Sequence, residues 1–355
     1  MSLFQELILI SLGKRQHFSR KLTENDWTFI YTEAQRQSLV GILLTGVEIV
    51  VGSGESKPNV LMQWIANGLQ LENRNRMLNA RCKEITGIFN DLGFRSCVLK
   101  GQGVALLYPN PLRRQSGDID LWVKGNRNVL YNVLKTRWAI GETVIHHADV
   151  KIFNDIPTEI HFVPSFVYNP FLYRKYKKFF NRLGDRQFAN YDEIMGFAYP
   201  TPDFNAIYSL MHILHHVLHE GIGLRQFLDY YYILKSLDKK QRLQVLDDME
   251  YLGLVKFAEA VMYVERQMFE LEPEFCLCQP NERLGKRLLA EIEMAGNFGK
   301  YDERYKDVNR KKKMDLYLHN VKRNFVFFEL APCEVLWAPI WKPCHFFWRK
   351  LKGYF

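Results

Sequence analysis

Two carboxylates separated by one residue lie at the start of a short apolar segment. Residues 119–123 are rich in β-formers and predict a strand. Because side chains two apart share a strand face, Asp118 and Asp120 lie side by side while Ile119 and Leu121 face the core. Adjacent carboxylates repel unless a cation holds them, and oxygen ligands suit Mg²⁺, which often shares its site with substrate phosphates. The pattern favours a Mg²⁺ site, with a solvated acidic turn as the alternative because this spacing is common.

A third acid follows in the segment 158–162. Glu159 alternates with apolar neighbours, so it shares one strand face with His161. If this strand pairs beside residues 118–123, Glu159 completes a three-carboxylate site. It would then act as a metal ligand or accept a proton from an attacking hydroxyl.

Residues 98–107 predict a strand, a glycine-containing turn and a helix. Free backbone N–H groups at such a helix start can cradle phosphate, and Lys100 adds positive charge. The alternative is that Gly101 and Gly103 only allow the chain to turn. The segment lacks Walker spacing, which disfavours a P-loop fold.

Arg114 lies four residues before Asp118. Its guanidinium is predicted to clamp an anionic phosphate. A structural pair with a carboxylate, or a solvated loop, is the alternative.

Together these segments resemble the DNA polymerase β-like nucleotidyltransferase superfamily. Within it the sequence is most similar to a group of uncharacterised bacterial nucleotidyltransferases. The motifs that carry the resemblance are Leu99-Lys100-Gly101, the segment 114–120, and Thr158-Glu159-Ile160-His161. The resemblance covers residues 73–166 and extends more loosely through 212–229 and the C-terminal tail.

The resemblance implies that Asp118 and Asp120 bind two Mg²⁺ ions bridging a nucleoside triphosphate (NTP), with Glu159 as the third acid. It also places Gly101 and Gln102 in the phosphate-binding turn, beside Lys100. One departure is that the serine usual in that turn is replaced, since residues 101–103 read Gly-Gln-Gly. Ser116 is the candidate to supply the missing hydroxyl.

A histidine stripe lies in the predicted helix 204–220. Offsets of 0, 3, 4 and 7 place His212, His215, His216 and His219 on one helix face. Zinc binding by two of them is geometrically allowed, but no third ligand is identifiable. His212, His216 and Arg225 are instead expected to line an acceptor pocket. An ion pair between Arg225 and Asp229, four residues apart, is the competing interpretation for the arginine.

The elements around these residues predict an α+β fold. A small mixed sheet forms a nucleotidyltransferase core, flanked by N-terminal and C-terminal helical regions. We expect a helical region at 1–72, the core at 73–200, and a helical domain with a basic aromatic tail at 201–355. Strands are expected at 96–99, 119–123, 142–153 and 158–163. Beyond residue 203, helices are expected at 204–220, 224–237, 239–252, 255–269 and 281–294.

Composition narrows the function class. The 355 residues are 47% hydrophobic and 25% charged, and the net charge of +9 favours anionic partners. Six scattered cysteines suggest a reducing, cytoplasmic location. The N-terminus does not read as a signal peptide, and no uninterrupted apolar run reaches the length of a membrane span.

The basic and aromatic tail includes Arg310-Lys311-Lys312-Lys313 and residues 346–355. A helix packed on the body is favoured over peripheral contact with an anionic membrane or nucleic acid.

The sequence thus predicts a Mg²⁺-dependent enzyme that transfers a nucleotidyl group from an NTP to an acceptor hydroxyl. A small molecule is the first choice of acceptor, with RNA or a protein side chain as alternatives. The competing hypothesis is a nucleotide-binding or membrane- or nucleic-acid-associated module built on a degenerate transferase core.

Overall fold

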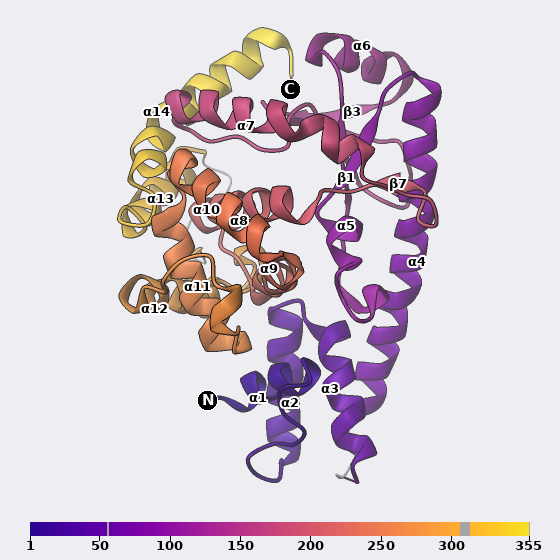
Figure 1. Ribbon diagram of the computed structural model, residues 1–355, viewed down its shortest axis with the longest axis vertical. Helices are drawn as coiled ribbons and strands as arrows, with labels where there is room; N and C mark the ends of the chain where they lie inside the picture. Colours follow the sequence, from indigo (N-terminus) through magenta and orange to yellow (C-terminus); the bar gives the residue numbers. More distant parts are fainter. Residues whose placement is uncertain (55–56, 306–312, 355) are drawn as a thin grey trace.

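The N-terminal part of the chain is helical, as predicted. The computed structural model describes residues 1–54, 57–305 and 313–354. It begins with four helices: α1 (Leu3–Ser11), α2 (Glu24–Arg36), α3 (Val40–Gly52) and α4 (Leu61–Asp91). Helix α2 starts with a capping box in which Thr23 and Asp26 satisfy each other's backbone N–H groups. Helix α4 runs along one side of the molecule (Figure 1), and the predicted boundary after residue 72 lies inside it.

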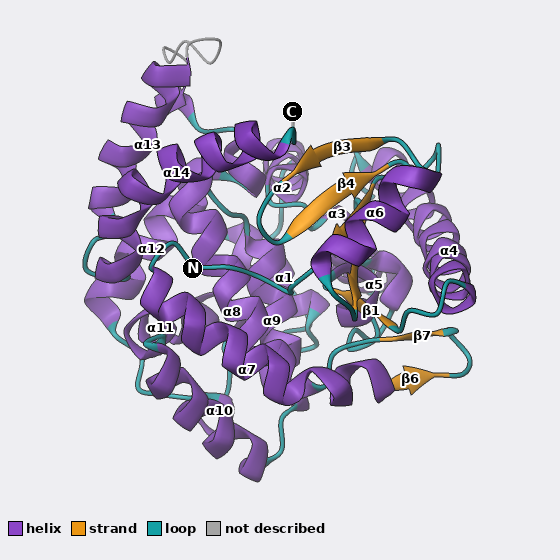
Figure 2. Ribbon diagram, turned by 90° about the horizontal axis from the view of Figure 1, so that it is seen from above, coloured by secondary structure: helices purple, strands orange, loops and turns teal. Residues whose placement is uncertain are grey.

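The core is a five-stranded mixed sheet (Figure 2). Its strands are β1 (Ser96–Leu99), β2 (Ile119–Val123), β3 (Ile140–Thr143), β4 (His147–Val150) and β5 (Thr158–His161). The order is β1-β2-β5-β4-β3, with β2 and β5 parallel and every other pair antiparallel. The predicted α+β class is therefore confirmed.

Alternation along β2 divides its side chains between two cores. Ile119 and Leu121 are buried against α4 and against α6 (Arg127–Arg137). Trp122, on the opposite face, stacks on Phe204 of the C-terminal helices, with ring centroids 5.8 Å apart. Asp120 shares this second face, so the sheet's fold places its carboxylate toward the helical domain.

One local expectation was wrong. The segment 142–153 forms a hairpin of β3 and β4 rather than one strand, because Val144 N–H donates to the His147 carbonyl and turns the chain. That turn contains none of the usual turn-forming residues that mark a hairpin in a sequence. The helix expected within residues 98–107 is α5 (Gly101–Ala105), which begins at the glycine turn itself. Gly103 allows this packing, because a Cβ there would lie 2.8 Å from the Val98 carbonyl oxygen.

A long helix after the sheet was not predicted. Helix α7 (Pro170–Ala189) begins with Asn169 as N-cap and Pro170 at its first turn. A small hairpin, β6 (Tyr191–Asp192) and β7 (Phe197–Ala198), then leads into the C-terminal helices.

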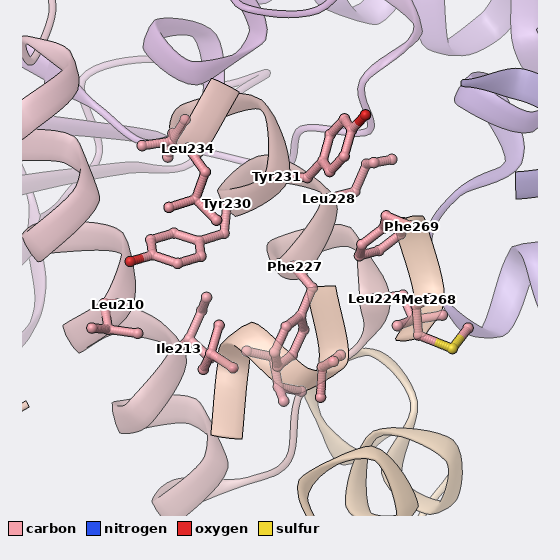
Figure 3. Close-up of a cluster of buried hydrophobic side chains, with 14 of the residues drawn as sticks. Leu210, Ile213, Leu224, Phe227, Leu228, Tyr230, Tyr231, Leu234, Met268 and Phe269 are labelled. Carbon is pink, nitrogen blue, oxygen red and sulfur yellow. The ribbon is translucent and has the colours of Figure 1, made fainter. Parts of the chain in front are cut away.

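The C-terminal helices lie close to the predicted ranges. They are α8 (Pro202–His219), α9 (Leu224–Ser236), α10 (Lys239–Leu252), α11 (Val255–Phe269) and α12 (Glu282–Ala295). Figure 3 shows their core, where Phe227 and Leu228 of α9 pack with Ile213 of α8 and Phe269 of α11. Short 3₁₀ turns occur at Pro111–Arg113, Pro273–Phe275, Asn297–Gly299 and Glu303–Tyr305.

The tail forms two further helices, α13 (Lys313–Val326) and α14 (Pro332–Lys352), at the outer edge of the molecule (Figure 1). Three of the four basic residues expected at 310–313, namely Arg310, Lys311 and Lys312, lie outside the described residues. Across the described ranges, none of the helices combines the length and hydropathy that a membrane crossing requires.

A buried ion pair fastens the segment before β2 to helix α9. Both Asp229 carboxylate oxygens accept hydrogen bonds from Arg114, at 2.7 Å from Nε and 2.7 Å from Nη2. Tyr108 donates its hydroxyl to the same carboxylate at 2.7 Å. Both charged residues are buried. The predicted pairing of Arg225 with Asp229 is therefore wrong, because the carboxylate is taken by a partner distant in sequence.

We expect Asp229→Ala to destabilise the fold by about 3–5 kcal/mol, because it leaves the Arg114 charge buried and unpaired. Urea unfolding measures the change. Lys286→Ala removes the exposed pair with Glu282 and serves as control, with a much smaller expected change in the free energy of unfolding. Equal costs for the two variants would contradict a structural role for the buried pair.

Candidate active site

One cavity of about 690 Å³ lies between the sheet and the helices α8, α9, α13 and α14. Three of its histidines come from β4, β5 and the preceding turn: His146, His147 and His161. Five come from helices: His212, His215, His216, His219 and His345. Eight of the ten histidines of the chain thus line one space. All three predicted acids line it as well.

The acids meet because of strand register. Parallel pairing of β2 with β5 sets Asp120 directly beside Glu159, and Asp118 immediately precedes β2. His161 Nε2 lies 2.9 Å from Asp120 Oδ1 and 3.4 Å from Glu159 Oε2. Lys100 Nζ also donates to Asp120 Oδ1, at 2.9 Å. The structure therefore brings the three acids and Lys100 together, on the side of the sheet that faces the helices.

The carboxyl groups differ in how their charge is stabilised. Burial and the adjacent Asp120 charge raise the pKa of Asp118 to about 6. Burial acts the same way on Asp120, but Lys100 and His161 outweigh it and hold that pKa below its ordinary value. Glu159 behaves similarly, since its hydrogen bond with His161 contributes to a lowered pKa. Asp118 opens onto the solvent in the cavity, so it is the carboxylate whose charge is least compensated.

This donor set fits a divalent cation. Mutual repulsion of Asp118 and Asp120 is the unfavourable term that a bound cation would relieve. Carboxylate oxygens are the ligands that Mg²⁺ prefers. Asp118, Asp120 and Glu159 line one cavity, but among the described residues their ligand atoms do not all lie within 4.8 Å of one another, so a Mg²⁺ site shared by the three stays a prediction.

The glycine turn lies at the same cavity. Lys100 is the N-cap of α5 with φ of 47°, a backbone conformation that side chains other than glycine adopt at a cost. Its ammonium and Gly101 both line the cavity. Gln102 does not: its side chain is buried against α4, where it contacts Asn79 and the Asn75 carbonyl. In this structure the Gln102 side chain therefore does not reach the cavity, and its place in a phosphate-binding turn stays a prediction.

Arg114 is also placed differently from the expected phosphate clamp. Its Nε and Nη2 are held by Asp229, and Nη1 donates to Ser116 Oγ at 2.7 Å. Every guanidinium nitrogen thus has a protein partner. Ser116 and Arg114 both line the cavity, and because Ser116 Oγ only accepts this bond, its O–H can still donate to a ligand.

Arg225 supplies the positive charge that Arg114 does not. It lines the cavity, its Nη1 donates to the Gln115 carbonyl at 2.8 Å, and its buried Nε has no partner. The guanidinium carbon of Arg225 lies 5.4 Å from the centre of the Phe298 ring. Among the residues described, no carboxylate forms an ion pair with it. A half-buried arginine without an anionic partner is suited to an anionic ligand.

The histidine stripe of α8 faces the cavity as expected. His212 Nε2 and His216 Nε2 are 2.9 Å apart, and His216 Nδ1 lies 2.8 Å from Glu220. Burial lowers the pKa of His212 and of His215 well below the ordinary value, so both are neutral. His212 and His215 thus offer uncharged imidazoles as hydrogen-bonding groups.

Sequence reasoning gave no role to the histidines of β4 and its turn. His147 Nδ1 lies 3.6 Å from Glu159 Oε2, and its Nε2 faces Asp149 at the same distance. Burial, with the charge of His161, lowers the pKa of His147 to about 4. The alternation of His147, Ala148 and Asp149 was a usable signal, because it places both polar side chains on one strand face.

The class of protein comes from sequence comparison. The family model described as uncharacterised nucleotidyltransferase matches residues 23–270. Because the match spans more than half of the chain, the protein belongs to this family. A search of curated proteins gives no significant match. Part of the cavity lies outside the matched range, since Phe298, Trp341 and Lys342 also line it.

We expect Asp118→Asn to raise the metal-free melting temperature above pH 6. An acid whose pKa is raised on folding costs stability when ionised, and this cost disappears as pH falls from about 6 toward 3.8. Melting curves in EDTA across this range measure it.

Asp155→Asn is the matched control. Arg81 lowers the pKa of Asp155, so this variant should lose stability at neutral pH. If Asp118→Asn behaves like the control, the uncompensated charge of Asp118 is refuted.

Proposed function

We propose that this protein catalyses Mg²⁺-dependent transfer of a nucleotidyl group from an NTP to an acceptor hydroxyl, as the resemblance to polymerase β-like enzymes implies. One observation carries the proposal. Asp118, Asp120 and Glu159 meet in one cavity that also holds Arg225, a guanidinium without an anionic partner. Reactions at a triphosphate need carboxylates that bind a metal ion, and next to them a positively charged side chain that binds phosphate.

The acids hold the reacting groups. When bound, Mg²⁺ supplies positive charge at the triphosphate oxygens. Asp118 and Asp120 would position it, and Glu159 would serve as a further ligand or accept the proton of the attacking hydroxyl. The acceptor oxygen forms a bond to the α-phosphorus, the bond from that phosphorus to the bridging oxygen breaks, and pyrophosphate leaves.

The basic residues orient the phosphates. Arg225 offers its unpartnered Nε–H, and Gly101 lets backbone approach closely at the start of α5. Lys100 is tied to Asp120 in this structure and would contribute charge from that position.

A small hydroxylated molecule is the favoured acceptor. The cavity volume of about 690 Å³ is in the range of small-molecule sites. Aromatic side chains, among them Phe166 and Trp341, and the imidazoles of His212 and His216 would contact it. An RNA end or a protein side chain is an alternative outcome of the assay below.

A nucleotide-binding module without transfer activity is the second candidate. The observation that favours it is the Lys100–Asp120 pair, because an ammonium there takes up charge that Mg²⁺ would otherwise neutralise. The two candidates differ in turnover, not in nucleotide binding.

The test is transfer of label from an α-³²P-labelled NTP to molecules of a cell lysate. We expect a labelled product with Mg²⁺, and loss of at least about 10²–10³ in rate for Asp118→Asn, because the developing charge is no longer compensated. Asp155→Asn is the control. Mg²⁺-dependent NTP binding without any product would instead establish the binding module, and absence of both would refute the proposal.

Arg225→Gln is expected to weaken NTP binding by roughly 10–100-fold. This is the loss that corresponds to about 1.5–3 kcal/mol, the contribution of a hydrogen bond to a charged group. Calorimetry with Mg²⁺ and NTP measures it. Arg76→Gln, which removes an exposed arginine on α4, is the control. Unchanged affinity in Arg225→Gln would remove this residue from the phosphate site.

A further inference from the structure

We propose that His147, Glu159 and His161 bind a divalent transition-metal ion, such as Zn²⁺, Mn²⁺ or Co²⁺. The site stands on its donor atoms alone. Its assignment as the second metal position of the transfer reaction rests on the proposed function.

The three donors converge because of strand pairing. Antiparallel pairing of β4 with β5 sets His147 opposite His161, and Glu159 lies two residues before His161 on the same face. One ligand atom from each residue falls within 4.8 Å of the others. No flexible loop is required to bring them together.

The spacing suits direct coordination. Two ligands about 2.1 Å from a tetrahedral metal are about 3.4 Å apart. Glu159 Oε2 lies 3.4 Å from His161 Nε2 and 3.6 Å from His147 Nδ1. An ion at this point would replace the proton that His161 Nε2 now shares with the neighbouring carboxylates.

The surroundings resemble those of metal-binding histidines. Such a histidine commonly directs its other ring nitrogen at a carboxylate. His147 Nε2 faces Asp149 Oδ1 at 3.6 Å. His146 Nε2 lies 2.9 Å from His147 Nδ1, so a further imidazole adjoins the site, and the other nitrogen of His146 is buried without a partner.

Ligand chemistry selects the kind of metal. Mg²⁺ takes oxygen ligands, whereas imidazole suits Zn²⁺, Co²⁺ and related ions. The Asp118–Asp120 position, which offers oxygens, is therefore chemically distinct from the position with two imidazoles and one carboxylate. The two positions are adjacent, because Asp120 and Glu159 lie side by side on the paired strands β2 and β5.

The experiment is Co²⁺ titration of metal-free protein without nucleotide, followed by visible absorption, with Zn²⁺ calorimetry in parallel. We expect one high-affinity ion per chain. His147→Ala and Glu159→Gln should each lower the affinity by at least about 10–100-fold, the loss that follows even when an outer partner of a ligand is removed. Melting curves verify that each variant is folded.

His216→Ala is the matched control, because this histidine lines the same cavity from α8 but is not among the three donors. Its Co²⁺ spectrum should match the wild type. If His216→Ala lost Co²⁺ binding and His147→Ala kept it, the ion would lie on the α8 stripe and the proposal would be overturned. The absence of Co²⁺ binding by the wild type would overturn it as well. Asp118→Asn should abolish Mg²⁺–NTP binding while keeping Co²⁺, so failure of the proposed function remains distinguishable.

A separate observation supports a second inference, on the outer face of α14. Six of its exposed positions are apolar residues or cysteines at helical spacing: Cys333, Leu336, Ile340, Cys344, Phe347 and Leu351. Leu336 is 53% exposed and Leu351 is 87% exposed. Such a stripe on a helix that packs its other side on the protein is an unpartnered amphipathic face.

We infer that this face lies on an anionic membrane surface. The exposed charged side chains described on α14 are Lys350 and Lys352, both positive, and the chain as a whole carries +9. Apolar residues backed by lysines are the composition of helices that lie in the membrane interface. Exposed Met314 and Leu318 of the adjoining α13 extend the apolar character.

Vesicle co-sedimentation tests the inference with the full chain. We expect binding to phosphatidylglycerol-containing vesicles and weak binding to phosphatidylcholine alone. The double variant Ile340→Ser with Phe347→Ser should bind at least about tenfold less, because apolar groups leave the acyl boundary. Leu243→Ser, at an exposed position of α10, is the control. The inference would be overturned if the double variant bound vesicles as well as Leu243→Ser does. It would also be overturned if the wild type formed a dimer that only the double variant disrupts.

Discussion

The architecture depends on burying one carboxylate, Asp120, in the middle of a sheet. Parallel pairing of β2 with β5 forces Glu159 beside it, and two adjacent buried charges are tolerated only when cations oppose them. Lys100 and His161 do this, each 2.9 Å from the same oxygen. The positive φ of Lys100 follows from that requirement, because the strand must end and α5 begin where the ammonium can reach Asp120.

Local patterns predicted the elements well and their contacts less well. Alternation predicts strands β2 and β5, and helical periodicity predicts helices α8 to α12, because both patterns can be read within a short stretch of sequence. The β3–β4 hairpin was missed because its turn lacks turn-forming residues. Similarly, the i,i+4 rule favoured Arg225 for Asp229, whereas Arg114 reaches it across the fold. The histidine cluster needed the β4–β5 register, which no window in the sequence specifies.

The cavity combines a part that the family model covers with a part that it does not. The acids, the glycine turn and Arg225 lie within residues 23–270. Phe298, Trp341 and Lys342 close the space from elements beyond that range. Trp341 stacks on Phe166, with ring centroids 4.8 Å apart, so the two parts are packed together at the site. On the proposed function, the part of the cavity within residues 23–270 would bind the nucleotide, and the helices beyond residue 270 would line the acceptor pocket.

Charge balance also separates the roles of the two aspartates. Asp120 already has Lys100 and His161 as partners, whereas Asp118 faces the cavity with a raised pKa and no ion pair among the described residues. On the proposed function, Asp118 is therefore the carboxylate whose charge a bound cation would compensate most. Lys100 would contribute its charge to the phosphates from its place beside Asp120, because one carboxylate oxygen cannot satisfy two cations equally.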